Sequence, residues 1–338
     1  MNAVTKRSFS LSTIPETCVP VDQATGPVVD RSQVAVIIPT YNARRFWAAL
    51  ANGLRLQGIP ASQVLIVDSS SDDGTRELAA AEGYQVFRID HRDFNHGGTR
   101  QFALSLVPWA SIAVFLTHDA VLATPDSIDL LLAAFRDKSV AVAYGRQLPR
   151  PGAGPIEAHA RLFNYPSRGE VRDFESRHTL GIKAAFCSNS FAAYRVQALL
   201  AAGGFPEKVI MAEDALAAGQ LLLLGWKVAY VAEARVYHSH AFTIAQEFQR
   251  YFDTGVYHRR EPWLRETFGS PGGEGKRFVL SELGYLTPHH LYLVPYALLR
   301  TVSKAIGYNL GFRGKLGAVW SRRLSNHKGY WDATKTVR

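Results

Sequence analysis

The feature that most restricts the fold of this chain is an alternation of continuous apolar runs with helix-like patterns. The apolar runs lie at residues 34–38, 64–68, 84–89 and 112–116. The helical patterns between them pass through Phe46, Leu50 and Leu54 and over residues 75–81 and 99–106. Strands that are apolar on both faces and alternate with helices are typical of a parallel sheet covered on both sides. The sequence therefore predicts an α/β fold.

The second half of the chain continues this pattern less regularly. A stretch rich in Pro and Gly at residues 145–155 predicts a loop. We then expect a strand at residues 183–195 with a helix as far as Ala202, a helix at 212–224 and a strand at 226–231.

These patterns divide the chain into three parts. Residues 1–31 show no periodicity and predict a loose arm. Residues 32–258 would form the α/β domain, with one half at 32–122 and the other at 123–258. Residues 259–338 are apolar, aromatic and basic, and predict a helical extension.

The positive charge of the protein is concentrated in this extension. Residues 259–338 hold 14 Lys and Arg against 5 Asp and Glu, and the remaining 24 basic and 24 acidic residues cancel, so the net charge of +9 belongs to the tail. A basic segment of this kind is a solvated face, a packing or dimer surface, or a surface that meets anionic lipid. The sequence leaves these alternatives open.

The cysteines and the N-terminus carry few signals. Cys18 and Cys187 form neither a disulfide framework nor a metal-binding spacing, so we expect both to be inert in a reducing compartment. No apolar segment follows Lys6 and Arg7, so no signal peptide is expected. No apolar run approaches the roughly 18 residues that predict a membrane-spanning helix.

Polar motifs stand at the ends of three predicted strands: PTYN at residues 39–42, DSSSDDGT at 68–75 and THD at 117–119. Ligands of open parallel sheets bind outside the carboxyl ends of the strands, so these segments are candidate site residues. Asp68 could accept hydrogen bonds from a nucleotide base. The alternative is that the segment DSSSDDGT is only a well-capped helix start. Neither G-x-G-x-x-G nor G-x-x-x-x-G-K-[ST] is present, which argues against a dinucleotide fold and a P-loop.

The segment FNHGGTR at residues 94–100 leads from the third strand into a helix. Its two glycines allow the backbone to approach a ligand closely. Arg100 in the first helical turn is unfavourable for the helix dipole, and a diphosphate at this N-terminus would explain it. An ordinary turn with a surface arginine is the alternative.

Two acids and two histidines lie further along the chain. Glu213 and Asp214 are adjacent at a predicted helix start, where they could simply complement the helix dipole. His238 and His240 are two residues apart on a predicted strand and so face the same side. Histidine is the commonest metal ligand, and a structural pair of histidines is the alternative. No zinc-protease or zinc-ribbon spacing accompanies them.

Taken in order, these segments resemble family 2 glycosyltransferases, which are inverting enzymes of the GT-A fold that use nucleotide sugars. The resemblance covers about residues 34–240. Its detail is similar to the bacterial rhamnosyltransferase branch in the segments DSSSDDGT, FNHGGTR, THDA, YGRQLP, GGFPE, HSH and KAIGYNLGF…LSNHKGYW. It implies a Rossmann-like, mostly parallel sheet with helices on both faces, with the nucleotide sugar bound by the first half of the domain and the acceptor by the second.

The resemblance also implies which residues bind the donor. Pro39, Tyr41 and Asp68 would hold the base, and His96, Gly97 and Arg100 would lie near the diphosphate. The full set of expected nucleotide-sugar-binding residues is Pro39, Thr40, Tyr41, Asn42, Asp68, Ser69, Ser70, Asp72, His96, Gly97, Arg100, His118 and Asp119.

Asp119 matches the last acid of the family's D-x-D metal motif. Thr117 stands where the first acid would be, so the sequence departs from the family there. One carboxylate, helped by His238 and His240, can still hold Mg²⁺ or Mn²⁺.

Asp214 matches the family's general base. Inverting transfer needs one carboxylate that accepts the proton of the acceptor hydroxyl, whereas a glycosidase needs two carboxyl groups around the bond. Glu213 is a poor second acid, because neighbours on a helix point apart. We expect the acceptor pocket to be bordered by Arg146, Ser188, Asn189, Glu213 and Trp263, with a purely structural tryptophan as the alternative for the last.

The donor implied by this branch is dTDP-L-rhamnose. The acceptor would be a saccharide or polyprenyl-linked saccharide, used in the synthesis of cell-surface polysaccharide at the inner face of the membrane. The basic, aromatic tail would then dock peripherally on anionic lipid. Nucleic acid is not an expected partner.

Two other functions compete with this interpretation. A sugar-nucleotide nucleotidyltransferase also pairs a parallel sheet with acids and Mg²⁺, but it usually opens with a Gly-rich signature after the first strand, and PTYNARR has no glycine. If the chain were a non-catalytic saccharide-binding protein, the placement of Asp119 and of the Glu213–Asp214 pair would have no functional explanation.

Overall fold

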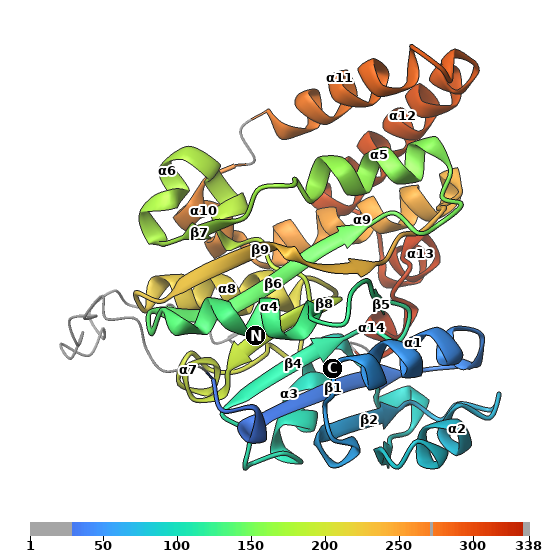
Figure 1. Ribbon diagram of the computed structural model, residues 1–338. Coiled ribbons are helices and arrows are strands. Elements are labelled where there is room, and N and C mark those ends of the chain that lie inside the picture. The colour runs from blue at the N-terminus through green and yellow to red at the C-terminus, as the bar shows by residue number, and fades with distance from the viewer. Residues whose placement is uncertain (1–28, 271–272, 334–338) are drawn as a thin grey trace, which may run out of the picture.

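The computed structural model describes residues 29–270 and 273–333, and most of the predicted arm, with Cys18, lies outside them. Within the described residues the chain forms one nine-stranded sheet in the order β3-β2-β1-β4-β8-β6-β9-β5, with β7 beside β9 (Figure 1). The strands are β1 Val34–Thr40, β2 Val64–Asp68, β3 Gln85–Arg88, β4 Ile112–Leu116, β5 Val121–Leu122, β6 Val140–Leu148, β7 Glu170–Arg172, β8 Phe191–Arg195 and β9 Lys227–Tyr237.

Helices surround the sheet (Figure 1). They are α1 Arg44–Leu56, α2 Thr75–Ala81, α3 His96–Ser105, α4 Ser127–Ala133, α5 Pro155–Asn164, α6 Arg177–Leu180, α7 Val196–Ala201, α8 Glu213–Leu223, α9 Ile244–Arg260, α10 Pro262–Phe268, α11 Glu274–Leu286, α12 Val294–Arg313, α13 Ala318–Leu324 and α14 Lys328–Ala333. The last five, α10 to α14, lie within the predicted helical extension.

The predicted α/β class and mostly parallel sheet are confirmed. Strands β1, β2, β3, β4, β6 and β9 run in one direction, and β5, β7 and β8 run in the other. Strand β8 lies antiparallel between β4 and β6, and an apolar run in the sequence carries no information about that direction.

Three predicted elements have different limits in the structure. Only the last five residues of the expected strand 183–195 are extended, because residues 181–185 form a short 3₁₀ helix. Strand β6 continues to Leu148, into the expected loop. Strand β9 continues to Tyr237, six residues beyond the prediction, and so delivers the histidine segment.

The core has two layers because alternate residues of each strand face opposite sides of the sheet. From β1, Val36 and Ile38 pack with Trp47 of α1 in one layer. Ile37 packs with Leu104 of α3 in the other layer. Both layers are needed to bury strands of this kind.

The sheet brings the polar strand ends to one edge. Thr40 at the end of β1 is in register with Asp68 at the end of β2. Strands β4 and β9 run in the same direction, so Asp119 and His238, which follow them, emerge at the same edge. The fold therefore gathers most of the predicted site residues on one side of the sheet.

Helices α9 and α12 of the C-terminal region lie side by side (Figure 1). Their backbones approach closely at three glycines. A Cβ added to Gly311 would meet the carbonyl of Phe252, and one added to Gly307 or Gly255 would likewise meet backbone of the facing helix. None of the described helices combines the length and the hydropathy needed to cross a membrane.

This helix contact yields a stability prediction. Gly311→Ala must push α12 away from α9, so it should lower the free energy of unfolding by about 1–3 kcal/mol. Gly284→Ala in α11 is the matched control, because nothing lies within 4 Å of its added Cβ and alanine favours the helix by up to about 1 kcal/mol. Thermal unfolding of both variants measures the difference, and equal melting temperatures would contradict the close packing.

Candidate active site

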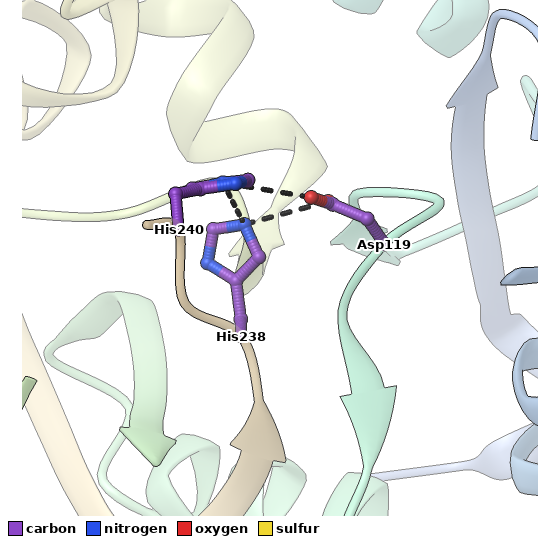
Figure 2. A group of neighbouring side chains, drawn as sticks. All are labelled: Asp119, His238 and His240. Atoms are coloured by element: carbon purple, nitrogen blue, oxygen red, sulfur yellow. Dashed lines mark hydrogen bonds and ion pairs between the residues drawn. The ribbon is translucent and has the colours of Figure 1, made fainter. Parts of the chain in front are cut away.

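Three metal-ligating side chains converge at the sheet edge. Asp119 follows β4, and His238 and His240 follow β9 (Figure 2). His238 Nε2 lies 3.4 Å from Asp119 Oδ1, His240 Nε2 lies 3.5 Å from Asp119 Oδ2, and the two Nε2 atoms are 3.1 Å apart. The three donor atoms lie within 4.8 Å of one another. We call these residues the Asp–His–His triad.

The protonation states of the triad suit a cation. Burial alone would raise the pKa of Asp119, but the neighbouring imidazoles of His238 and His240 hold that pKa well below its usual range. Burial lowers the pKa of His238, and burial together with His238 lowers the pKa of His240 to about 4. At neutral pH the triad therefore offers one carboxylate and two neutral imidazoles. A donor set of one oxygen and two nitrogens fits a divalent ion such as Mn²⁺ better than Mg²⁺, which prefers oxygen alone.

Arginines flank the triad. Arg150 Nη2 donates to the carbonyl of Asp119 at 2.8 Å and to Asp119 Oδ2 at 3.2 Å. The guanidinium groups of Arg45 and Arg150 lie 4.5 and 5.0 Å from the centre of the Phe46 ring. Both arginines, with His240, also line a pocket next to the triad. This pocket concentrates positive charge where an anionic group could bind.

Asp214 lies at the start of α8, half-buried and hydrogen-bonded by two backbone amides. Its Oδ2 accepts from the N–H of Asn189 at 3.0 Å and its Oδ1 from the N–H of Ala215 at 2.9 Å. Burial, with the negative charge of Glu213 beside it, raises the pKa of Asp214 to about 7. A carboxylate with such a pKa is suited to accept a proton near neutral pH.

Glu213, in contrast, is 5% exposed and has fixed partners. Its Oε1 accepts hydrogen bonds from Arg100 Nη1 at 2.9 Å and from Asn189 Nδ2 at 3.0 Å. Burial would raise the pKa of Glu213, but Arg100 keeps it low, so the carboxylate stays charged. Glu213 is therefore a buried counter-ion of Arg100, and its expected position at the acceptor pocket stays a prediction.

Arg100, the partner of Glu213, is buried as well. It lies on α3 with 4% of its surface exposed, and its guanidinium also donates to the carbonyl of His96. In this structure its described contacts are therefore to Glu213 and to the backbone of α3, and its expected place near the diphosphate stays a prediction. Gly97 is tightly packed, since an added Cβ would meet the Pro206 carbonyl and approach Glu213. Helix α3 thus presses against α8 and supports the two acids.

The loops after β1 and β2 form the expected nucleotide side of the site. Asp68 is completely buried and accepts hydrogen bonds from Thr40 Oγ1 at 2.9 Å and from the N–H of Ser71 at 2.9 Å. Its carboxylate therefore organises the loop, and its expected contact with the base stays a prediction. Pro39 and Ser69 are buried as well.

Other residues of these loops remain accessible. Tyr41 is exposed and stacks on His91 with ring centres 4.4 Å apart. Asn42 Oδ1 accepts the N–H of the exposed Asp72 at 3.1 Å. Ser70 Oγ donates to the carbonyl of Ile89. The ring of Tyr41 is accordingly the best-placed surface for a planar base.

Two of the expected donor residues are histidines. His118 precedes Asp119 in the triad loop, is partly exposed, and contacts the backbone of Pro39. His96 begins α3, with its ring centre 5.2 Å from that of His327 in the C-terminal region. Burial lowers the pKa of both, so both are neutral at pH 7.

The expected acceptor residues divide into two groups. Ser188 and Asn189 lie next to Asp214, through the amide contact given above, and Arg146 Nε donates to the carbonyl of Tyr165 at 3.1 Å. Trp263 packs on Gly219 of α8, and its indole N–H donates to Glu261. These contacts favour the structural alternative for Trp263, and its expected role at the acceptor stays a prediction.

Sequence reasoning missed Arg150, Gln147 and Arg161. Gln147 lies between the triad and Ser188, and its amide contacts His238, Arg161 and Ser188. Gln147 lies in the YGRQLP segment, which is part of the family resemblance. The sequence of a loop-like stretch does not, however, show which residues a polar side chain contacts.

A short chain of contacts joins the triad to Asp214. His238 Nδ1 lies 2.9 Å from Gln147 Oε1, and Gln147 Nε2 donates to Ser188 Oγ at 2.8 Å. The next residue, Asn189, donates its N–H to Asp214. The triad and Asp214 are therefore connected within one group of contacts.

Comparisons with known proteins agree with this geometry. A family model described as Glycosyl transferase family 2 matches residues 35–201. The O-antigen chain rhamnosyltransferase RfbN of Salmonella typhimurium is 44% identical over 302 residues, which is 89% of this chain and 96% of that protein. The O-antigen chain rhamnosyltransferase WbaN of Salmonella anatum is 44% identical over 299 residues, which is 88% of this chain and 95% of that protein.

Among solved structures, the mannosyltransferase PcManGT from Pyrobaculum calidifontis, in complex with GDP-Man and Mn²⁺, has a similar fold. It is 19% identical, with a TM-score of 0.53, over 94% of this chain and 89% of that chain. The family match and the two near-full-length relatives together show that this chain belongs to glycosyltransferase family 2 and is a glycosyltransferase.

Proposed function

We propose that this enzyme is an inverting rhamnosyltransferase that transfers L-rhamnose from dTDP-L-rhamnose to a polyprenyl-linked saccharide in O-antigen synthesis. The sugar and the pathway are supported by the names of the two relatives. The observation that carries the mechanism is the single half-buried carboxylate of Asp214, placed beside a buried Glu213–Arg100 ion pair.

Asp214 would act as the general base. Its carboxylate accepts the proton of the acceptor hydroxyl while that oxygen attacks the anomeric carbon of the donor from the side opposite the diphosphate. The amides of Asn189 and Ala215 hold the carboxylate in place during this step. Configuration at the anomeric carbon is inverted because there is one displacement.

The leaving nucleoside diphosphate needs its charge neutralised at the triad. Asp119, His238 and His240 would hold a divalent cation, with Mn²⁺ the better fit, and when bound this ion supplies positive charge to the diphosphate. Arg45 and Arg150 line the adjacent pocket and add positive charge from the protein itself. The exposed ring of Tyr41 offers a stacking surface for the thymine base.

The C-terminal region has features that support binding of the enzyme to a membrane surface. The polar side of α12 is turned inward, where Arg300 and Lys304 pair with the buried Glu247 of α9. Its outer face is apolar and exposed, with Leu299 and Val302 53% and 54% exposed. We define the outer face of α12 as Leu298, Leu299, Val302 and Ile306.

An exposed apolar helix face next to basic side chains suits the interface of an anionic bilayer. Trp320 and Val319 of α13 are also exposed, and the tail carries the whole net charge of the protein. The proposal therefore includes peripheral docking of this face on anionic lipid, where a polyprenyl-linked acceptor would be found.

Asp214→Asn tests the base. The amide keeps the shape of the side chain but cannot accept a proton, so kcat should fall by about 10²- to 10⁴-fold with the affinity for dTDP-L-rhamnose unchanged. Release of dTDP measures turnover, and equilibrium binding measures affinity. Glu266→Gln, an exposed acid on α10, is the control and should match the wild-type enzyme.

The pH profile gives an independent measure of the same group. Asp214 must be deprotonated to act, so kcat/KM of the wild-type enzyme should rise tenfold per pH unit on the acid side and level off above about pH 7. The residual activity of Asp214→Asn should show no such rise. Wild-type turnover in the variant, or an unchanged acid limb, would remove Asp214 as the base.

The double substitution Val302→Glu/Ile306→Glu tests membrane docking. It places two negative charges on the outer face of α12, so co-flotation with phosphatidylglycerol-containing vesicles should fall at least about tenfold. Leu56→Glu, at an exposed apolar position of α1, is the control and should float like the wild-type protein. Equal recovery of the double variant and the wild-type protein would contradict the proposal.

A further inference from the structure

Gln147 is a buried amide with three hydrogen-bonding neighbours. It lies on β6, is 2% exposed, and its Oε1 is 2.6 Å from Arg161 Nη1 and 2.9 Å from His238 Nδ1. Its Nε2 is 2.8 Å from Ser188 Oγ. A buried side-chain amide that meets this many partners can satisfy them in only one orientation.

Arg161 determines that orientation. A guanidinium group only donates hydrogen bonds, so the atom of Gln147 that faces it must be the carbonyl oxygen. With the amide turned the other way, two donors would face each other at 2.6 Å. The same oxygen can only accept from His238, so the proton of the His238 ring must be on Nδ1.

This tautomer leaves a lone pair on His238 Nε2, the atom that faces the triad. Nε2 lies 3.4 Å from Asp119 Oδ1 and 3.1 Å from His240 Nε2. The opposite tautomer, with Nε2–H donating to Asp119, would need Gln147 to donate to Nδ1, and the contact with Arg161 forbids it. Without a cation this lone pair can accept the Nε2–H of His240, and it is open to a cation when the proton of His240 is on its other ring nitrogen.

We propose that Gln147, locked by Arg161, is a positioning residue that holds His238 in the Nδ1–H tautomer and so keeps its Nε2 available to a divalent cation. This inference rests on the cation site of the proposed function. It adds a residue that does not touch the cation, the donor or the acceptor. Such outer partners commonly change metal affinity by about 10- to 100-fold.

Nitrogen NMR of the full-length, metal-free protein tests the tautomer directly. Two-bond ¹H–¹⁵N correlations distinguish a protonated ring nitrogen from a bare one, and His238→Asn identifies the signal. The wild-type protein should show His238 protonated at Nδ1, and Gln147→Met should move protons to Nε2. Protonation of His238 at Nε2 in the wild-type protein would overturn the inference.

Mn²⁺ binding, followed by the electron paramagnetic resonance signal of the free ion, tests the consequence. Gln147→Met should weaken Mn²⁺ binding by about 10- to 100-fold. Gln147→Glu keeps an acceptor for His238 and Arg161 but loses the donor to Ser188, so it should retain near-wild-type affinity. The exposed Gln197→Met is the control and should bind like the wild-type protein.

These measurements separate the inference from the proposed function. They use Mn²⁺ alone and need neither donor nor acceptor, so a different sugar specificity would leave their results unchanged. Thermal unfolding of each variant excludes loss of the fold. Mn²⁺ binding by Gln147→Met that equals the wild type would overturn the role of Gln147 alone, whereas no Mn²⁺ binding by the wild type would overturn the cation site of the proposed function together with that role.

Discussion

The buried ion pair between Arg100 and Glu213 decides which of two adjacent acids can work as a base. A charge at a buried position is costly unless a partner neutralises it, and Arg100 supplies that partner from another helix. Glu213 therefore stays ionised, and its carboxylate stays paired with Arg100. Its charge and the burial of the site then raise the pKa of Asp214, which remains half-buried with two amide contacts. Gly97 at the start of α3 has no room for a side chain, because an added Cβ would meet the carbonyl of Pro206 and approach Glu213.

The rest of the site depends on the common direction of β4, β6 and β9. Their carboxyl ends carry Asp119, Gln147 and His238 to one edge of the sheet. Antiparallel β8 lies between β4 and β6 and starts just after Asn189, so the loop before it brings Ser188 and Asn189 to that edge from the other direction. One mixed sheet thus places a cation site and a base within a few hydrogen bonds of each other.

The strands and helices of the first half could be predicted because their signals are local. Continuous apolar runs gave β2 and β4 with the observed limits, and α2 likewise. The direction of β8 and the length of β9 could not be predicted, because both depend on neighbours that are distant in sequence.

The site shows the same division between local and distant information. The meeting of Asp119, His238 and His240 was expected from the family resemblance, whereas the strand limits alone ended six residues too early to bring the histidines there. The burial of Asp68 and Arg100 and the packing of Trp263 could not be predicted, because a polar side chain at a strand end or helix start can serve the fold as well as a ligand.

The most direct test of the central claim, one displacement with one base, is the anomeric configuration of the product. Carbon–proton coupling at the transferred sugar's anomeric centre should show inversion relative to the donor, and retention would contradict the account.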